Sequence, residues 1–165
     1  MTGAEAHARA RVVELPDLAA TARFAAAIAA ELRASDVVAL SGTLGAGKTT
    51  LARAILLALG HGGEVPSPSF SIIEVYEPPG VRLPVVHADF YRLTDVAEAV
   101  EIGLDDYRTG AALIAEWPEK AGGFAHEAAC LSIRLEIAAE AVGERRWAIV
   151  EAGPDWVMRG LWTSL

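Results

Sequence analysis

A glycine-rich stretch between an apolar run and a helix-favouring run constrains the fold of this chain more than any other feature. It satisfies every fixed position of the pattern G-x-x-x-x-G-K-[ST]. Residues 37–40 before it read as a buried strand, and residues 51–59 after it favour a helix. A strand, a loop and a helix in this order are the setting of a P-loop. The stretch is Gly42, Thr43, Leu44, Gly45, Ala46, Gly47, Lys48, Thr49 and Thr50.

The residue types in this stretch suit the binding of a phosphate chain. Glycines at 42, 45 and 47 allow backbone angles closed to other residues and leave the main chain open to an anion. The helix that follows would direct unpaired N–H groups and its positive dipole end at the phosphates. We expect Lys48 to reach the outer two phosphates, Thr49 to bind magnesium and Thr50 to contact an inner phosphate. The predicted nucleotide-binding residues are Leu44, Gly45, Ala46, Gly47, Lys48, Thr49 and Thr50.

A tight strand-to-helix connection without a ligand is the alternative, because short glycine motifs also match by chance. The use of lysine argues against it. Lysine occurs only at positions 48 and 120, and arginine supplies the other strong bases. A lysine at the one position that the motif requires indicates a function for Lys48.

Length and composition predict one P-loop domain in a cytosolic, cytoplasmic protein. The chain has 165 residues, of which 53% are hydrophobic, enough for a sizeable core. No apolar run is long enough to span a membrane, and residues 1–11 lack the hydrophobic segment of a signal peptide. We expect residues 1–10 to be disordered and the apolar tail, residues 152–165, to pack on the domain or to meet a partner. The single cysteine, Cys130, is predicted to be a small buried hydrophobe.

The charge balance argues against direct binding of nucleic acid. The formal net charge is −8, whereas such binding is driven by basic residues that replace counterions. Any role in RNA chemistry would need a partner, and neither DNA nor a membrane is an expected partner. The dense basic pair Arg145 and Arg146 could touch phosphate, but it is more typical of a solvated turn.

The remaining pattern predicts an α/β fold with a mixed, mainly parallel central sheet, an antiparallel hairpin and flanking helices. The hairpin is predicted from the β-rich segments 70–77 and 81–87 on either side of Pro-Pro-Gly. Helices are expected from Asp17 or Thr21 to about 34, after the P-loop to Gly60, and from Thr94 or Asp95 to about 101. The apolar face of the first helix contains Leu18, Phe24, Ile28 and Leu32. The other predicted strands are 11–14, 37–40, 111–115, 131–137 and 147–151.

Two carboxylates follow apolar strands and are therefore expected to face the nucleotide. Glu116 ends the run 111–115, and we assign it to the metal, because an isolated carboxylate at the end of a buried strand is expensive. Asp89 is left either to orient the attacking water or to support the outer shell of the metal, with His87 on the same strand face. The alternatives are a surface ion pair of Asp89 with Arg92 and a core role for His87.

The segment after the P-loop helix has two possible interpretations. Residues 65–70 contain two prolines that restrict the chain, and the hydroxyls of Ser67 and Ser69 are available to a γ-phosphate or a metal. The segment is either a switch that responds to nucleotide or an ordinary loop.

Four segments together resemble a known family. They are Leu44-Gly45-Ala46-Gly47-Lys48-Thr49-Thr50, Pro66-Ser67-Pro68-Ser69-Phe70, His87-Ala88-Asp89-Phe90-Tyr91-Arg92-Leu93 and Glu116-Trp117-Pro118-Glu119-Lys120. In this order they are similar to the bacterial TsaE family, also called YjeE. The resemblance covers roughly residues 14–137 and includes the segment 101–107. The family more usually has threonine where Ser69 stands. Serine keeps the hydroxyl group at this position.

The resemblance implies a weak ATPase needed to make threonylcarbamoyl adenosine beside the anticodon of tRNA. In that family TsaE binds the TsaD and TsaB pair and drives its cycle with ATP, while TsaD transfers the group and tRNA is reached only through the partners. Carried over by motif, Thr49 and Glu116 would hold Mg²⁺. The implied catalytic residues are Lys48, Asp89 and Glu116. Residues 16–21 would lie near the adenine.

Three other functions share some of these sequence features. A small-molecule kinase would share the P-loop and the strand-end acid, but it should also have an arginine-rich lid, and no such cluster occurs in the sequence. A nucleotide-sensing module would bind ATP without productive turnover. A GTPase is disfavoured because the sequence contains no Asn-Lys-x-Asp element for reading guanine.

Overall fold

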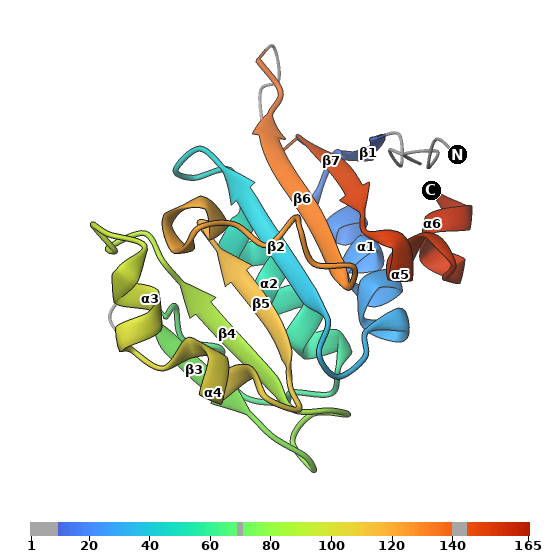
Figure 1. Ribbon diagram of the computed structural model, residues 1–165. Coiled ribbons are helices and arrows are strands. Elements are labelled where there is room, and N and C mark those ends of the chain that lie inside the picture. The colour runs from blue at the N-terminus through green and yellow to red at the C-terminus, as the bar shows by residue number, and fades with distance from the viewer. Residues whose placement is uncertain (1–9, 69–70, 140–144) are drawn as a thin grey trace, which may run out of the picture.

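A seven-stranded sheet with the order β1-β7-β6-β2-β5-β4-β3 organises the chain (Figure 1). The computed structural model describes residues 10–68, 71–139 and 145–165. The strands are β1 (Arg11–Leu15), β2 (Val37–Gly42), β3 (Ile73–Tyr76), β4 (Val85–Asp89), β5 (Ala112–Glu116), β6 (Cys130–Ile137) and β7 (Arg146–Ala152). The helices are α1 (Leu18–Glu31), α2 (Lys48–Ala58), α3 (Ala97–Glu101), α4 (Leu104–Arg108), the 3₁₀ helix η1 (Pro118–Ala121), α5 (Pro154–Val157) and α6 (Gly160–Ser164).

The middle of the sheet is parallel and its margins are antiparallel. Strands β6, β2, β5 and β4 run parallel to one another, whereas β1 with β7, β7 with β6 and β3 with β4 pair antiparallel. This arrangement confirms the predicted mixed α/β fold with a parallel centre and an antiparallel hairpin. The second strand of that hairpin begins at Val85 rather than at residue 81. The preceding segment leaves the sheet because the Arg82 guanidinium donates to the carbonyls of Ala29 and Leu32 at the end of α1.

Two hydrophobic cores lie on opposite faces of the sheet. One joins the sheet to α1 and α2 and includes Phe24, Ile28 and Ile55, while the other joins it to α3 and α4 and includes Phe90 and Leu104. Every residue of β5 is buried, which agrees with the continuous apolar run that precedes Glu116. The predicted burial of Cys130 is also confirmed, since it belongs to the second core.

Helix α1 begins after Asp17, the first of the two predicted starts, and not at Thr21. The Asp17 carboxylate accepts a hydrogen bond of 2.7 Å from the Ala20 amide, which caps the helix. Phe24, Ile28 and Leu32 are buried as expected. Leu18 differs, because it lies in the first turn and 56% of its surface is exposed.

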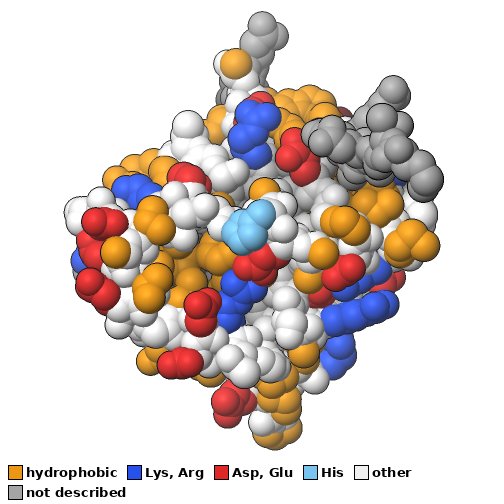
Figure 2. All heavy atoms as spheres, viewed as in Figure 1, with side chains coloured by type: hydrophobic (Ala, Val, Ile, Leu, Met, Phe, Trp, Pro, Cys, Tyr) orange, Lys and Arg blue, Asp and Glu red, His pale blue; other side chains and the backbone are white. Residues whose placement is uncertain are grey.

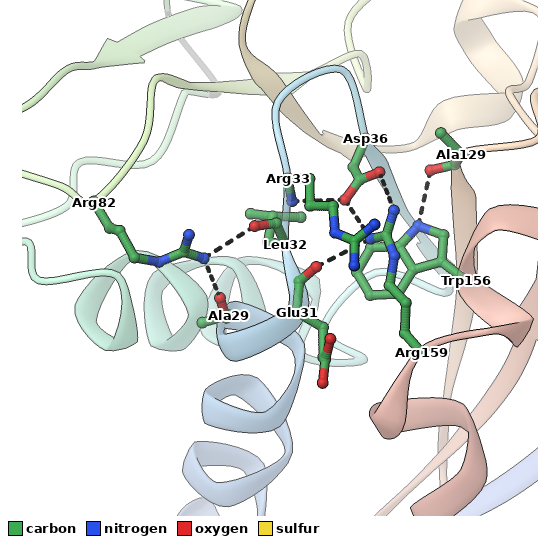
Figure 3. A network of polar contacts seen from close by, with 9 residues as sticks. All are labelled: Ala29, Glu31, Leu32, Arg33, Asp36, Arg82, Ala129, Trp156 and Arg159. Atoms are coloured by element: carbon green, nitrogen blue, oxygen red, sulfur yellow. Dashed lines mark hydrogen bonds and ion pairs between the residues drawn. The ribbon is translucent and has the colours of Figure 1, made fainter.

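The apolar tail packs against the rest of the molecule at the end of the sheet away from the P-loop (Figure 3). The Trp156 indole donates a 2.8 Å hydrogen bond to the Ala129 carbonyl, and the Arg159 guanidinium lies 4.2 Å from the Trp156 ring centroid. Arg159 also forms a buried ion pair with Asp36, at the start of β2. Of the two expectations for this tail, packing on the domain is therefore the one observed.

The outer surface mixes acidic and hydrophobic side chains. Figure 2 shows Asp and Glu spread among hydrophobic residues on the side where α3 and α4 lie. The segment 95–107 contains five acidic residues and no basic one, which accounts for much of the net charge of −8. Within residues 10–68, 71–139 and 145–165, no helix is both long enough and apolar enough to cross a bilayer.

Candidate functional site

The glycine-rich loop connects the middle strand of the sheet to α2, as the motif predicts. Gly42, Gly45 and Gly47 have φ values of +133°, +79° and +105°, a region that favours glycine. A Cβ on Gly42 would lie 2.4 Å from the Leu135 carbonyl oxygen of β6, so the loop also needs glycine there for space. Helix α2 then begins at Lys48, and the amides of its first turn have no partner inside the helix.

Lys48 is buried inside the curve of the loop. Its ammonium donates hydrogen bonds of 2.8 Å to each of the carbonyls of Gly42 and Thr43. It also lies 4.2 Å from the centroid of the Trp117 ring. Burial lowers the pKa of Lys48, and the nearby carboxylates of Glu116, Glu119 and Asp89 offset part of that effect. The loop thus holds a positive charge at its centre with little access to water.

The Glu116 carboxylate meets the start of α2. It is 1% exposed at the end of β5, and its Oε2 accepts a 2.8 Å hydrogen bond from the Thr49 hydroxyl. Its Oε1 lies 2.9 Å from Nε2 of His87, which comes from the neighbouring strand β4. The structure therefore brings together Thr49 and Glu116, the two residues that the sequence suggested for a metal.

Asp89 ends β4 directly beside Glu116. The strand register pairs these two residues, and Asp89 is 7% exposed. Its Oδ1 accepts a 3.0 Å hydrogen bond from the Tyr91 amide. Asp89 faces the same pocket as Lys48 and Thr49. Both predicted strand-end acids thus lie at one edge of the sheet.

Two hollows lie on either side of the loop. The first has a volume of about 250 Å³ and is lined by the P-loop together with Asp89, Glu116 and Trp117. The second has a volume of about 120 Å³ and lies between the loop, the start of α1 and the sheet. Leu18 and Thr21 line the second hollow, so its wall includes part of the segment 16–21. Gly45, Gly47 and Thr50 contribute to both hollows.

Trp117 and Arg146 also contribute to the site. No part in binding is predicted for Trp117 from the sequence, and for Arg146 the sequence offered either a phosphate contact or a solvated turn. Trp117 follows Glu116 with a φ of +57°, and this left-handed backbone places its ring over Lys48. In the sequence, the position of Trp117 directly after the strand-end acid Glu116 is the feature that could have indicated this role. Arg146 donates a 3.1 Å hydrogen bond to the Ala46 carbonyl of the loop, across 100 residues of sequence that carry no signal of this contact. Arg145 forms an ion pair with Glu14, in line with the solvated alternative.

The proposed switch segment is described only in part. Ser67 lies within the described residues, whereas Ser69 and Phe70 lie outside them. Residues 1–9, most of the segment expected to be disordered, also lie outside.

The side chains present fit a magnesium ion that is shared with a phosphate chain. Thr49 and Glu116 supply hard oxygen donors, which Mg²⁺ prefers. In the part of the chain that the structure describes, no three His, Cys, Asp or Glu side chains form a metal cluster of their own. This donor set agrees with an ion that takes one carboxylate and one hydroxyl from protein and its other ligands from phosphate and water.

Comparison with known proteins gives the family. A family model described as "Threonylcarbamoyl adenosine biosynthesis protein TsaE" matches residues 15–147. A solved structure, the crystal structure of YdiB from Bacillus subtilis, superposes with a TM-score of 0.68 at 26% identity. That superposition covers 94% of this chain and 93% of YdiB.

Curated relatives called "tRNA threonylcarbamoyladenosine biosynthesis protein TsaE" agree with this match. The protein from Haemophilus influenzae is 43% identical over 93 residues, which is 56% of this chain and 58% of that protein. The protein from Mycobacterium leprae is 41% identical over 115 residues, which is 64% of this chain and 70% of that protein. The chain thus spans less than two thirds of the Haemophilus relative. The family match covers most of the chain, which therefore belongs to the TsaE family.

Proposed function

We propose that this chain binds ATP with Mg²⁺ at the P-loop and hydrolyses the ATP slowly. This activity is required for the synthesis of threonylcarbamoyl adenosine on tRNA. The observation that carries the proposal is the 2.8 Å hydrogen bond between Thr49 and Glu116, beside the buried ammonium of Lys48. A strand-end acid in contact with the P-loop hydroxyl is the arrangement that holds the metal in P-loop hydrolases.

Each polar residue of the site has a proposed part. The loop amides of residues 44–50 and the Lys48 ammonium bind the phosphates and stabilise the charge that develops on them. Thr49 and Glu116 hold the Mg²⁺, which when bound neutralises phosphate charge. Asp89 either orients the attacking water or supports the shell of the metal, since it lies beside Glu116 in the same pocket. Lys48, Asp89 and Glu116 are thus the proposed catalytic residues.

The second hollow is the proposed place for the adenine. It shares Gly45, Gly47 and Thr50 with the phosphate pocket, so one nucleotide could extend from one hollow into the other. Its wall is partly apolar, with Leu15, Leu18 and Leu51 available to a flat base. The segment 16–21 contributes Leu18 and Thr21 to this wall.

The proposed partners are proteins of the TsaD and TsaB kind, which would carry out the transfer and hold the tRNA. Membership of the TsaE family supports this pathway. The net charge of −8 supports an indirect relation to tRNA, because a surface this acidic repels phosphate. We propose a cytoplasmic location, where tRNA is modified.

Two measurements test the proposal. Calorimetry is done with ATP and with GTP, each in the presence and in the absence of Mg²⁺. It should show that ATP binds and that the affinity for ATP is higher when Mg²⁺ is present. Phosphate release should be slow for the chain alone and should rise when TsaD and TsaB from the same host are added. The absence of ATP binding under all these conditions would overturn the proposal. Turnover that responds to a small-molecule acceptor and not to the two proteins would instead identify a kinase, and binding without turnover a sensing module.

A further inference from the structure

A buried histidine contacts the carboxylate of the candidate metal site from the interior of the sheet. His87 is 0% exposed, and its Nε2 lies 2.9 Å from Oε1 of Glu116. Residues 85, 87 and 89 alternate along β4, so His87 points to the same face of the sheet as Asp89. The lining of the phosphate pocket includes Asp89 and Glu116 but not His87. His87 therefore reaches Glu116 from behind the site.

The hydrogen-bond pattern defines the form of the imidazole. An ionised carboxylate only accepts hydrogen bonds, so Nε2 of His87 carries the proton that lies toward Glu116. The other nitrogen, Nδ1, is buried and has no partner among the described residues. A proton on Nδ1 would be a buried donor without an acceptor, which costs about 1–3 kcal/mol. The contacts therefore correspond to a ring whose Nε2–H donates to Oε1 of Glu116.

The two oxygens of Glu116 have different partners on different sides. Oε1 is bound to His87 in the sheet interior, and Oε2 is bound to the Thr49 hydroxyl, which lines the pocket. An apolar side chain at position 87 would fill the core without leaving a nitrogen unpaired. Among the described residues, the contact with Glu116 is the one polar interaction of the His87 ring, and it offsets the cost of the unpaired Nδ1.

We infer that His87 is a positioning residue, whose Nε2–H holds Oε1 of Glu116 so that Oε2 faces Thr49 and the metal of a bound nucleotide. This role rests on the proposed function, because it concerns the affinity of the same site for Mg²⁺. Partners behind a ligand carboxylate orient it, and their loss lowers metal affinity by about 10- to 100-fold.

The contact itself is tested on the nucleotide-free chain by nitrogen NMR of labelled histidine. The chain contains four histidines, and the His87 signal is the one that a His87→Gln variant lacks. We expect Nε2 to carry a proton. A His87 ring protonated at Nδ1 alone would overturn the inference.

The role is tested with two amide variants that differ by one methylene. The Gln amide of His87→Gln can place an N–H where Nε2 lies, whereas the shorter amide of His87→Asn cannot reach Glu116. ADP affinity measured over a series of Mg²⁺ concentrations should show that His87→Asn needs about 10- to 100-fold more Mg²⁺. His87→Gln should stay near wild type, and both should bind ADP without Mg²⁺ as wild type does. Val85→Ala, a cavity variant on the same face of β4, controls for lost packing and should keep the wild-type Mg²⁺ dependence.

The outcomes separate this inference from the proposed function. A folded His87→Asn variant with unchanged Mg²⁺ dependence would overturn the role of His87 alone. Equal loss in the Gln and Asn variants would do the same, because it would show that the hydrogen bond is not what matters. A wild-type chain without Mg²⁺-dependent nucleotide binding would overturn the proposed function and this role with it.

Discussion

The guanidinium of Arg159 donates two hydrogen bonds, of 2.6 and 2.9 Å, to the carboxylate of Asp36. The two residues are 123 positions apart, and both are buried. The pair ties the end of the chain to the first turn before β2, the strand that leads into the P-loop (Figure 3). The tail is therefore a structural part of the domain that carries the loop.

Replacing Arg159 with leucine should destabilise the fold strongly. The change leaves the Asp36 carboxylate buried without its cation, which typically costs about 3–5 kcal/mol. Arg134→Leu is the matched control, because Arg134 pairs with Glu136 in solvent and such pairs contribute about 0–1 kcal/mol. Urea unfolding followed by circular dichroism measures both. Equal losses in the two variants would contradict the structural role of the tail.

Glycine should be required at position 42 far more than at position 45. A Cβ at Gly42 would meet the Leu135 carbonyl oxygen at 2.4 Å, whereas a Cβ at Gly45 would meet no described residue within 4 Å. Gly42→Ala should therefore cost about 3 kcal/mol or more, and Gly45→Ala about 1–2 kcal/mol from backbone angle alone. Thermal unfolding of the two variants gives the comparison. A Gly42→Ala chain as stable as Gly45→Ala would show that the loop can move away from β6.

Lys48→Ala should weaken ATP binding by about 10- to 100-fold, because hydrogen bonds to a charged group are worth about 1.5–3 kcal/mol. Lys120→Ala is the natural control, since it removes the other lysine of the chain and Lys120 is absent from the phosphate pocket. Calorimetry with ATP and Mg²⁺ measures both affinities. Equal effects would indicate that net charge rather than the position of Lys48 determines binding.

Glu116→Gln should separate binding from hydrolysis. The variant keeps the shape of the side chain but loses the charge that a metal needs, so phosphate release with partner proteins should fall by about 100-fold or more. ATP binding should remain measurable through Lys48 and the loop. Glu119→Gln, in the exposed part of η1, removes a nearby carboxylate and should keep most of the activity. Near-normal hydrolysis by Glu116→Gln would refute the assignment of Glu116 to the metal.

The Cys130 thiol should contribute to stability at neutral pH and lose that contribution in alkali. Burial raises the pKa of Cys130 from its ordinary 9.0 to about 11. The folded state therefore keeps the proton longer than the unfolded state, so the contribution is full below about pH 9 and is lost as the pH rises toward 11. The difference in unfolding free energy between wild type and Cys130→Ala measures it. A difference that stays constant over this range would contradict the prediction.

The local features of the fold and site could be predicted because their signals lie within short stretches of sequence. The P-loop motif fixes the order of strand, loop and helix, and an apolar run that ends in an acid identifies Glu116. Asp89 follows from the same rule, and the sheet register places it beside Glu116. The hydrophobic periodicity of α1 wrongly predicted burial of Leu18, because the first turn of the helix extends beyond the core.

The remaining features depend on contacts between distant residues. The hydrogen bond between His87 and Glu116 joins residues that are 29 positions apart and lie on two neighbouring strands. The order of strands in the sheet cannot be predicted from either segment alone. The carbonyls that hold Arg82 outside the sheet lie at the end of α1, about 50 residues earlier, so the hairpin is shorter than its β-rich sequence suggests. Arg146 and Arg159 likewise act on partners more than 90 residues away.

The strand that carries the P-loop has neighbours on both of its edges, β6 on one side and β5 on the other. An outer strand such as β1 or β3 can fray while the other strands stay paired, whereas β2 can be released only if the whole sheet comes apart. The amides at the base of the loop should therefore exchange with solvent as slowly as any in the molecule. The stem of the loop should thus be as stable as the fold itself.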